Sequence, residues 1–275
     1  MFRFSAHHIK TTDKFGFLPQ EYSRFKHGAI NIARKFGYEM ADKFIANVLR
    51  KHYDGRPILV LPSAWSHIPT ASYFLCGYFT DKLNAYLFEC NRTVAEAGKI
   101  CRSVSYRDDY GMMSAEQRYN LIKNDVFYMD KNAADGKILL FVDDVKVTGT
   151  HERIIVNMLD RYSITGDCYT LYYAEVANPH LPPNVENELN YAYVKSLDEI
   201  AHIIKHDEFR FNTRVVKYIL DADDQCFDRF IAAQSRNFIE DLYYNAVGNE
   251  YFKFNAYKRN MHKLKIKLYD TMRQL

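Results

Sequence analysis

The sequence lacks several features that would place a protein in a class at once. Its 275 residues contain no apolar run of the roughly 20 residues that cross a bilayer. The start, MFRFSAHHIK, has no apolar stretch of the kind found in secretory signals. The five cysteines are odd in number, widely separated and without a Cys-x-x-Cys pair, which argues against a disulfide framework or a zinc site. We therefore expect a cytoplasmic protein that makes no contact with membranes.

An excess of charge of one sign is also missing. Lys+Arg 37 against Asp+Glu 34 gives a formal net charge of +3, which gives no support to a protein that wraps nucleic acid. The segment 251–275 is the exception, with seven Lys or Arg and one acid. We interpret it as a solvated helix face, with contact to nucleic acid or a phosphate as the alternative. Nucleic acid is not an expected partner.

Several catalytic signatures are absent as well. The chain has no Gly-x-Ser-x-Gly, His-Glu-x-x-His, Walker or Gly-x-Gly-x-x-Gly motif. Hydrophobic residues nevertheless make up 48% of the chain, enough for one substantial core with or without a small accessory domain. The chain is therefore expected to be globular, and any catalytic site in it depends on other motifs.

Hydrophobic patterning predicts an α/β core. Short apolar runs predict strands at Ile58–Leu61, Ala85–Phe88, Lys137–Val142, Cys168–Val176 and Tyr191–Val194. Helical spacing occurs in 21–50, after Pro69 and from about Thr150. Strands that alternate with helices indicate an open, mainly parallel sheet flanked by helices.

The ends of the chain differ from this core. We predict an N-terminal helical segment over 1–56, which is irregular to residue 20 and then helical, with Gly28 and Gly37 as candidate breaks. The α/β core spans 57–206, and a C-terminal helical cap spans 207–275. Residues 91–118 between the second and third predicted strands are polar and weakly periodic, and a loop of this length usually has a function.

The segment KILLFVDDVKVTGTHERII, residues 137–155, carries the strongest chemical signal. A buried strand is expected to end at Asp143 and Asp144, and a helix is expected to follow Thr148-Gly149-Thr150, with Thr150 as a candidate N-cap. In a parallel sheet, ligands bind beyond the carboxyl ends of the strands. The turn can hold a phosphate through backbone N–H groups, and the acids suit sugar hydroxyls or a Mg²⁺ ion met through water. Ribose 5-phosphate matches this layout.

This segment resembles the signature with which type I phosphoribosyltransferases bind 5-phosphoribosyl 1-pyrophosphate (PRPP). The signature consists of four apolar residues, two acids, two or three mostly apolar residues and a Thr/Gly phosphate loop. The resemblance implies a phosphoribosyltransferase-like fold, with ribose held by the acid pair and the 5-phosphate held by the loop. The implied PRPP contacts here are Asp143, Asp144, Val147, Thr148, Gly149, Thr150 and His151. The alternative is a chance acid pair beside a βα turn of another doubly wound fold.

A second stretch, LPSAWSHIPTA from Leu61, resembles the pyrophosphate loop of orotate phosphoribosyltransferases. The resemblance implies that Ser63, Ala64, Trp65 and Ser66 contact pyrophosphate. The basic residue expected near Ser66 is missing, and His67 replaces a glycine. In the same family a long loop after the second core strand closes over the reaction. Residues 91–118 occupy that place, are expected to be poorly ordered without ligand, and supply Arg102 and Arg107 as candidate catalytic cations beside Asp143 and Asp144.

The resemblance implies a Mg²⁺-dependent enzyme that transfers a 5-phosphoribosyl group from PRPP to a nitrogen of a small, nucleobase-like acceptor. Val147 stands where hypoxanthine-type enzymes carry an acid, which disfavours that acceptor. A hood made from the N-terminal segment and the C-terminal helices would recognise the acceptor. Tyr22 to Gly28 also resembles a stretch of phosphoribosyltransferase-like proteins from bacterial stress-response clusters, including those linked to tellurite resistance, whose acceptor is open. The alternatives are a non-catalytic PRPP or nucleotide sensor on the same fold, and a hydrolase or phosphorylase of a phosphoribosylated metabolite. A homodimer is retained as an expectation.

Overall fold

The computed structural model describes residues 1–102, 116, 127–182 and 184–272. Its strands are β1 (Phe2–Ile9), β2 (Ile58–Pro62), β3 (Glu96–Ala97), β4 (Cys101–Arg102), β5 (Phe127–Tyr128), β6 (Ile138–Lys146) and β7 (Cys168–Val176). The helices before β7 are α1 (Pro19–Lys26), α2 (Ile30–Phe44), a π-helical turn (Ile45–Leu49), α3 (Arg50–His52), α4 (Ala71–Glu89), α6 (Lys131–Ala134) and α7 (Thr150–Arg161). Those after it are α8 (Val185–Asn190), α9 (Leu197–His206), α10 (Thr213–Leu220), α11 (Asp224–Ala232), α12 (Arg236–Gly248), a 3₁₀ turn (Tyr251–Lys253) and α13 (Asn255–Met272).

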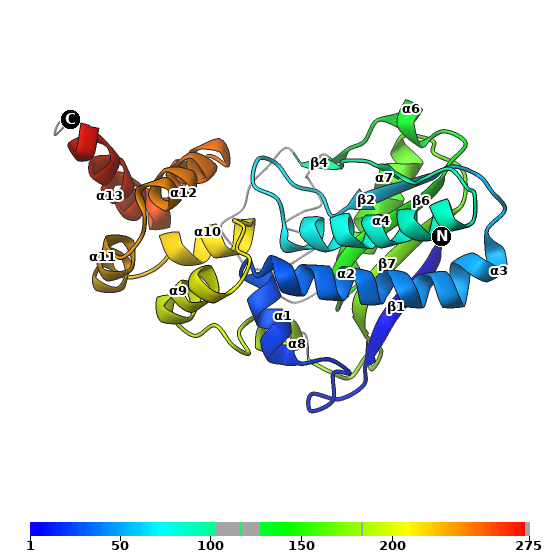
Figure 1. Cartoon of the computed structure of the whole chain (residues 1–275), viewed down its shortest axis with the longest axis horizontal. Helices are drawn as coiled ribbons and strands as arrows, with labels where there is room; N and C mark the ends of the chain where they lie inside the picture. Colours follow the sequence, from blue (N-terminus) through cyan, green and yellow to red (C-terminus); the bar gives the residue numbers. More distant parts are fainter. Residues whose placement is uncertain (103–115, 117–126, 183, 273–275) are drawn as a thin grey trace.

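The main sheet has the order β1-β7-β6-β2-β3, and each neighbouring pair is parallel. A separate antiparallel pair joins β4 to β5. Helices α2 and α4 lie together on the same side of the sheet, as Figure 1 shows. The predicted open, mainly parallel α/β sheet flanked by helices is therefore confirmed.

Strand β6 shows how period-two alternation builds both faces of this sheet. Ile138, Leu140 and Val142 join the core under α2 and α4. Leu139 and Phe141 point the other way, into a smaller apolar cluster that includes Met158 of α7. Because successive strand side chains alternate, a strand buried on both faces has a continuous apolar run rather than an alternating one. That run is the signal by which the sequence located β6.

Two predicted strands are wrong. Ala85–Phe88 lies inside α4, where Leu83 and Leu87 are both fully buried one helical turn apart. This helix is apolar on several sides, so a four-residue window of it has the composition of a buried strand. Tyr191–Val194 follows the end of α8 and forms a turn rather than a strand.

The N-terminus also differs from the prediction. Residues 2–9 form the edge strand β1, where an irregular segment was expected. Phe4 and Ala6 alternate with Ser5 and His7, and His7 packs on the rings of Phe17 and Tyr173, so polar residues next to the core weaken the apolar pattern. Gly28 does separate α1 from α2, with φ at +102°, whereas Gly37 lies within α2.

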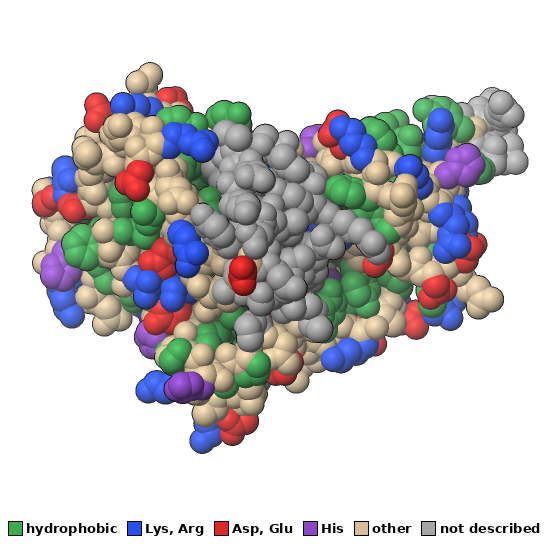
Figure 2. Space-filling model, turned by 180° about the vertical axis from the view of Figure 1, so that it is seen from behind, with side chains coloured by type: hydrophobic (Ala, Val, Ile, Leu, Met, Phe, Trp, Pro, Cys, Tyr) green, Lys and Arg blue, Asp and Glu red, His purple; other side chains and the backbone are tan. Residues whose placement is uncertain are grey.

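Helices α8 to α13 gather beyond one end of the sheet, and α10 to α13 form the helical end of the chain after residue 207 (Figure 1). The basic segment forms α13, and several of its charges pair with α11: Arg259 and Lys263 with Asp224, and Lys263 with Asp228. Figure 2 shows the same mixing of cations and acids over the described surface on that side of the molecule. Within the described ranges, no helix is long and apolar enough to cross a membrane.

Helices α2 and α4 approach each other closely at Gly37, which gives a test of this packing. A Cβ on Gly37 would lie 2.7 Å from the Leu75 carbonyl oxygen and 2.9 Å from the Phe79 nitrogen, which are backbone atoms that cannot rotate away. We expect Gly37→Ala to lower the free energy of unfolding by about 1–3 kcal/mol in a denaturant titration. The matched control is Gly77→Ala in α4, where a Cβ meets nothing within 4 Å. Helix propensity predicts a gain of up to about 1 kcal/mol there, so equal effects at the two sites would refute the packing argument.

Candidate functional site

A cavity of about 610 Å³ opens at the carboxyl ends of β2 and β6. Its walls come from the loop after β2, the turn after β6, the end of α1, and helices α8 and α10. The predicted site residues Ser63, Ala64, Trp65, Ser66, Arg102, Asp143, Asp144, Val147, Thr148, Gly149, Thr150 and His151 all line it. Arg107 lies outside the described residues, as does most of the loop that was predicted to close. The described part of that loop contains β3 and β4.

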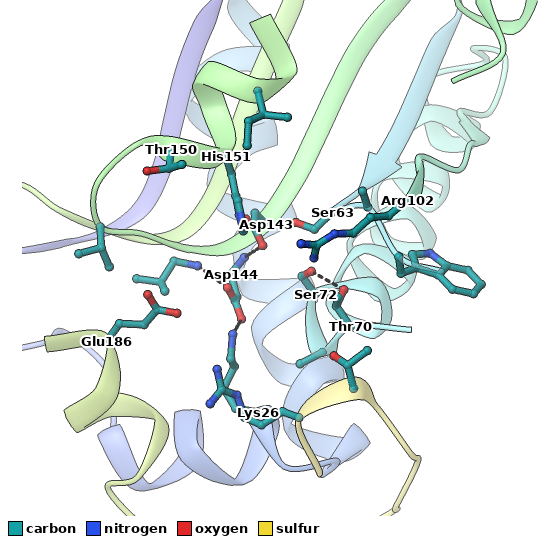
Figure 3. Close-up of a pocket in the computed structure, with 18 of the residues that line it drawn as sticks. Lys26, Ser63, Thr70, Ser72, Arg102, Asp143, Asp144, Thr150, His151 and Glu186 are labelled. Carbon is teal, nitrogen blue, oxygen red and sulfur yellow. Dashed lines mark hydrogen bonds and ion pairs between the residues drawn. The ribbon is translucent and has the colours of Figure 1, made fainter. Parts of the chain in front are cut away.

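Strand β6 does not end at the acid pair, as the sequence had suggested, but continues to Lys146. The alternation of the strand therefore sends the two acids to opposite faces. Asp143 points toward α7, on the side of Leu139 and Phe141, and contacts His151. Asp144 points to the face of α2 and α4 and meets Lys26 at the end of α1. Figure 3 shows the two carboxylates reaching apart in this way.

Asp143 is held in its charged form. Its Oδ2 accepts a hydrogen bond from Nδ1 of His151 at 3.0 Å, and its Oδ1 accepts one from the Asp144 backbone N–H at 2.9 Å. Burial opposes ionisation, but His151, the Ser63 hydroxyl and the charge of Lys26 outweigh it and lower the pKa of Asp143 to about 2. For His151, burial acts against the charge and Asp143 more than compensates, so the pKa of His151 lies above its usual value.

Asp144 is in a less favourable environment. It is 5% exposed, and its Oδ2 pairs with the Lys26 ammonium while its Oδ1 accepts from the Val145 N–H at 2.8 Å. Burial raises the pKa of Asp144 above its ordinary value, the charge of Lys26 counteracts that rise, and the charge of Asp143 adds to it. The Lys26 ion pair is therefore what keeps a charged carboxylate at this position.

The turn after β6, at the start of α7, can hold an anion. Gly149 has φ +71° and precedes the first residue of α7, so Gly149 and not Thr150 is the N-cap. The hydroxyls of Thr148 and Thr150 lie 2.8 Å apart. The first N–H groups of a helix have no intrahelical acceptor, and the helix dipole favours negative charge at this end. With His151 beside it, the turn can hold a phosphate group.

The loop after β2 has cations beside it that its own sequence lacks. Trp65 N–H donates to the Ile100 carbonyl and the Arg102 N–H donates to the Trp65 carbonyl, each at 3.2 Å. These bonds bring the Lys99 ammonium to 3.6 Å from the centre of the Trp65 ring, a cation–π contact. Arg102 points toward the acid pair in Figure 3. The structure thus places Lys99 against the Trp65 ring and Arg102 at the cavity, although the sequence around Ser66 has no Lys or Arg.

Another wall of the cavity, formed by α10 and α8, carries no motif in the sequence. Helix α10 places Arg214, Lys217, Tyr218 and Asp221 at the cavity, with the spacing i, i+3, i+4, i+7 of one helix face. The buried Glu186 and the ring of Tyr191, 6.0 Å from that of Tyr218, continue this wall from α8. The only sequence signal was the polar face of an amphipathic helix, which usually faces solvent.

An acid pair and a Thr-Gly-Thr turn that leads into a helix line one cavity at the carboxyl edge of the parallel sheet of an α/β protein. The comparisons with known proteins give the family. Residues 2–264 match the family model described as PRTase ComF-like, where PRTase denotes phosphoribosyltransferase, and the chain belongs to this family. None of the curated proteins matches the chain.

Among solved structures, a hypoxanthine phosphoribosyltransferase from Trypanosoma cruzi is similar in part. That structure is a mutant complexed with the product IMP. The alignment covers 55% of this chain and 77% of that chain, with 14% identity and a TM-score of 0.32.

The Lys26–Asp144 pair can be tested through stability. Removing one partner of a buried pair leaves an uncompensated charge, so Lys26→Met should lower the free energy of unfolding by about 3 kcal/mol at pH 7. Since the pKa of Asp144 is raised in the folded state, the folded protein takes up a proton as the pH falls, and the deficit should shrink on acidification. Denaturant titrations between pH 5 and pH 8, taken as a rough working range, measure both effects.

The matched control is Lys35→Met, which breaks the exposed pair with Glu21 and should change stability by less than about 1 kcal/mol. Adding Asp144→Asn to Lys26→Met should restore most of the loss, because no buried charge remains. A deficit that does not depend on pH, or that the second substitution does not reduce, would contradict this account.

Proposed function

We propose that the protein is a Mg²⁺-dependent phosphoribosyltransferase that binds PRPP in this cavity and transfers the 5-phosphoribosyl group to a nitrogen of a nucleobase-like acceptor, with release of pyrophosphate. Its membership of the family supports the class of reaction. The single observation that carries the assignment of the site is the placement of Asp143, Asp144 and the turn at Gly149 around one cavity. The two carboxylates would accept hydrogen bonds from the ribose hydroxyls, and the turn would donate hydrogen bonds to the phosphate at the other end of the same ligand.

In this proposal the 5-phosphate lies on the turn 148–150 and the ribose hydroxyls donate to the carboxylates. The first N–H groups of α7 and the Thr148 hydroxyl bind the phosphate oxygens. Asp143, whose pKa is about 2, stays an acceptor throughout the neutral range. Lys26 holds Asp144 in the same role from the opposite side.

The acid pair fits a hydrated magnesium ion. Each carboxylate oxygen already accepts one hydrogen bond, and the described residues contain no group of three His, Cys, Asp or Glu that could enclose an ion. Mg²⁺ usually keeps several waters and is bound through one or two carboxylates together with substrate phosphates. Asp143 and Asp144 would hold it through water, and the ion would neutralise part of the pyrophosphate charge.

The reaction joins the acceptor nitrogen to C1 of the ribose and breaks the bond from C1 to the pyrophosphate oxygen, which leaves with both electrons. Positive charge develops on the ribose and negative charge on the leaving group. Arg102 lines the cavity beside the loop after β2 and would stabilise that negative charge in the transition state. The enzyme contributes mainly position and fixed charges.

The wall formed by Tyr191 and Tyr218 is proposed to receive the acceptor. Two tyrosine rings at the cavity surface suit a flat heteroaromatic ring, and Arg214 and Lys217 beside them suit polar ring substituents. The alternative, a sensor that binds PRPP without turnover, uses the same ribose and phosphate contacts. Release of pyrophosphate separates the two.

The first test measures binding and turnover together. The protein is titrated calorimetrically with PRPP and Mg²⁺, and pyrophosphate release is then followed with a panel of nucleobases. Asp144→Asn should weaken PRPP binding by about tenfold or more, because a hydrogen-bonded charged acceptor is lost. Asp207→Asn is the control, since Asp207 is a buried partner of α1 through Arg24 but does not line the cavity. An unchanged affinity in Asp144→Asn removes the ribose contact, and binding without pyrophosphate release favours the sensor.

The second test addresses the phosphate turn. We expect Gly149→Ala to cost about 1–2 kcal/mol of stability, because alanine is strained at positive φ, and to weaken PRPP binding further by at least about tenfold. The existing structure has room for the methyl group, whose nearest neighbour is Lys146 Cε at 3.5 Å, so the binding loss would report the approach of a phosphate.

Gly136→Ala separates the two effects of the Gly149 substitution. Gly136 has φ +69° and open space around it, and it does not line the cavity, so the strain is the same without any ligand contact. Equal PRPP affinities in the two variants would contradict the phosphate site.

A further inference from the structure

The side chain of Asn249, in the helical cap, forms hydrogen bonds with the loop after β2. This residue ends α12 and is 4% exposed. Its Oδ1 accepts hydrogen bonds from the backbone N–H groups of His67 and Ile68, each at 3.0 Å. Its Nδ2 donates to the Tyr251 hydroxyl at 3.0 Å. About 180 residues of sequence separate the partners, yet both ends of the amide are satisfied in a buried place.

The amide can take only this orientation. With oxygen and nitrogen exchanged, an NH₂ group would face the N–H donors of His67 and Ile68, and both of those bonds would be lost. The preceding residue also lies close to the loop, because a Cβ on Gly248 would lie 2.3 Å from the His67 ring. Glu250 then takes a left-handed turn, with φ +58°, that leads to Tyr251. The three hydrogen bonds of Asn249, called the Asn249 clamp below, therefore connect the cap and the loop.

The loop is held on its other side as well. Trp65 exchanges backbone hydrogen bonds with the segment at Ile100 and Arg102. Together with the Asn249 clamp, these bonds use the N–H groups of Trp65, His67 and Ile68. Ser63 and Ser66 line the cavity, whereas His67 and Ile68 do not. The held loop thus presents serine side chains to the cavity and turns two of its backbone donors away from it.

We propose that Asn249 is a positioning residue of the pyrophosphate site. By taking the N–H groups of His67 and Ile68, it fixes the loop so that Ser63 and Ser66, which line the cavity together with Arg102, receive the pyrophosphate group. The inference rests on the proposed function, because it assumes that PRPP occupies the cavity. It adds that the cap belongs to the leaving-group side of the site and is not only a wall for the acceptor.

The test compares two ligands on the full-length protein with Mg²⁺. PRPP engages the ribose, phosphate and pyrophosphate sites, whereas ribose 5-phosphate lacks the pyrophosphate. The ratio of their dissociation constants therefore isolates the contacts of the loop. Asn249→Leu removes the acceptor and should reduce this ratio by about tenfold while the affinity for ribose 5-phosphate stays the same.

Three further variants make the result specific. Asn249→Asp keeps an acceptor for both N–H groups and should keep the ratio within about threefold of wild type. Tyr251→Phe, at a residue that also lines the cavity, removes the bond to Asn249 Nδ2 and keeps both bonds to the loop; it should shift the ratio in the same direction by a smaller factor, and it serves if Asn249→Leu does not fold. Asn245→Leu, on the same helix and with a side chain that donates to the Asp241 carbonyl, should leave both affinities unchanged.

The outcomes separate this inference from the proposed function. If wild-type protein binds neither ligand, the proposed function fails. If wild type binds both equally well, or if Asn249→Leu weakens both to the same extent or neither, the positioning role of Asn249 is overturned while the ribose and phosphate site stands. Selective loss of the pyrophosphate contribution, with recovery in Asn249→Asp, supports the role.

Discussion

The continuation of β6 through its acid pair is the constraint on which the rest of the cavity depends. A strand that ended at Asp143 would leave both carboxylates on a flexible turn. Because β6 runs on to Lys146, alternation fixes one acid toward α7 and the other toward α1. Each then meets its own partner, His151 for Asp143 and Lys26 for Asp144. The two carboxylates can stay close in the chain because each has a separate hydrogen-bond partner.

This arrangement also explains why elements from distant parts of the chain are needed. A buried Asp144 is stable as an anion only beside a cation, and the nearest cation that packing can supply is Lys26, 118 residues away in the sequence. The α1 helix therefore takes part in the site as well as in the core. Likewise the cations near Ser66 come from the segment at Lys99 and Arg102, which pairs with the loop through backbone bonds.

The parts of the structure that could be predicted from sequence are those coded over short distances. The strands at Ile58 and Lys137 and the helix from Thr150 follow from local apolar periods, and the structure confirms them. The grouping of Asp143 with Gly149 needs only a strand, a turn and a helix in succession. By contrast, α4 was misjudged over Ala85–Phe88 because its apolar surface hides the helical period, and β1 was missed because polar residues such as Ser5 and His7 interrupt its apolar pattern. The contacts of Lys26, Lys99 and Asn249 depend on tertiary packing, for which a single sequence has no signal.

The position of β1 has a consequence for how the chain assembles. Phe2 pairs with Tyr169 and Ile9 with Val176, so the first strand to be synthesised has its only partner in the last strand of the sheet. At roughly 5–20 residues per second, synthesis of the intervening residues takes on the order of ten to thirty seconds. Throughout that interval the aromatic and apolar residues of the N-terminus have no sheet edge to join. The pairing of β1 with β7 can form only after β7 has left the ribosome. It joins residues that are far apart in the sequence, and contacts of this kind slow folding.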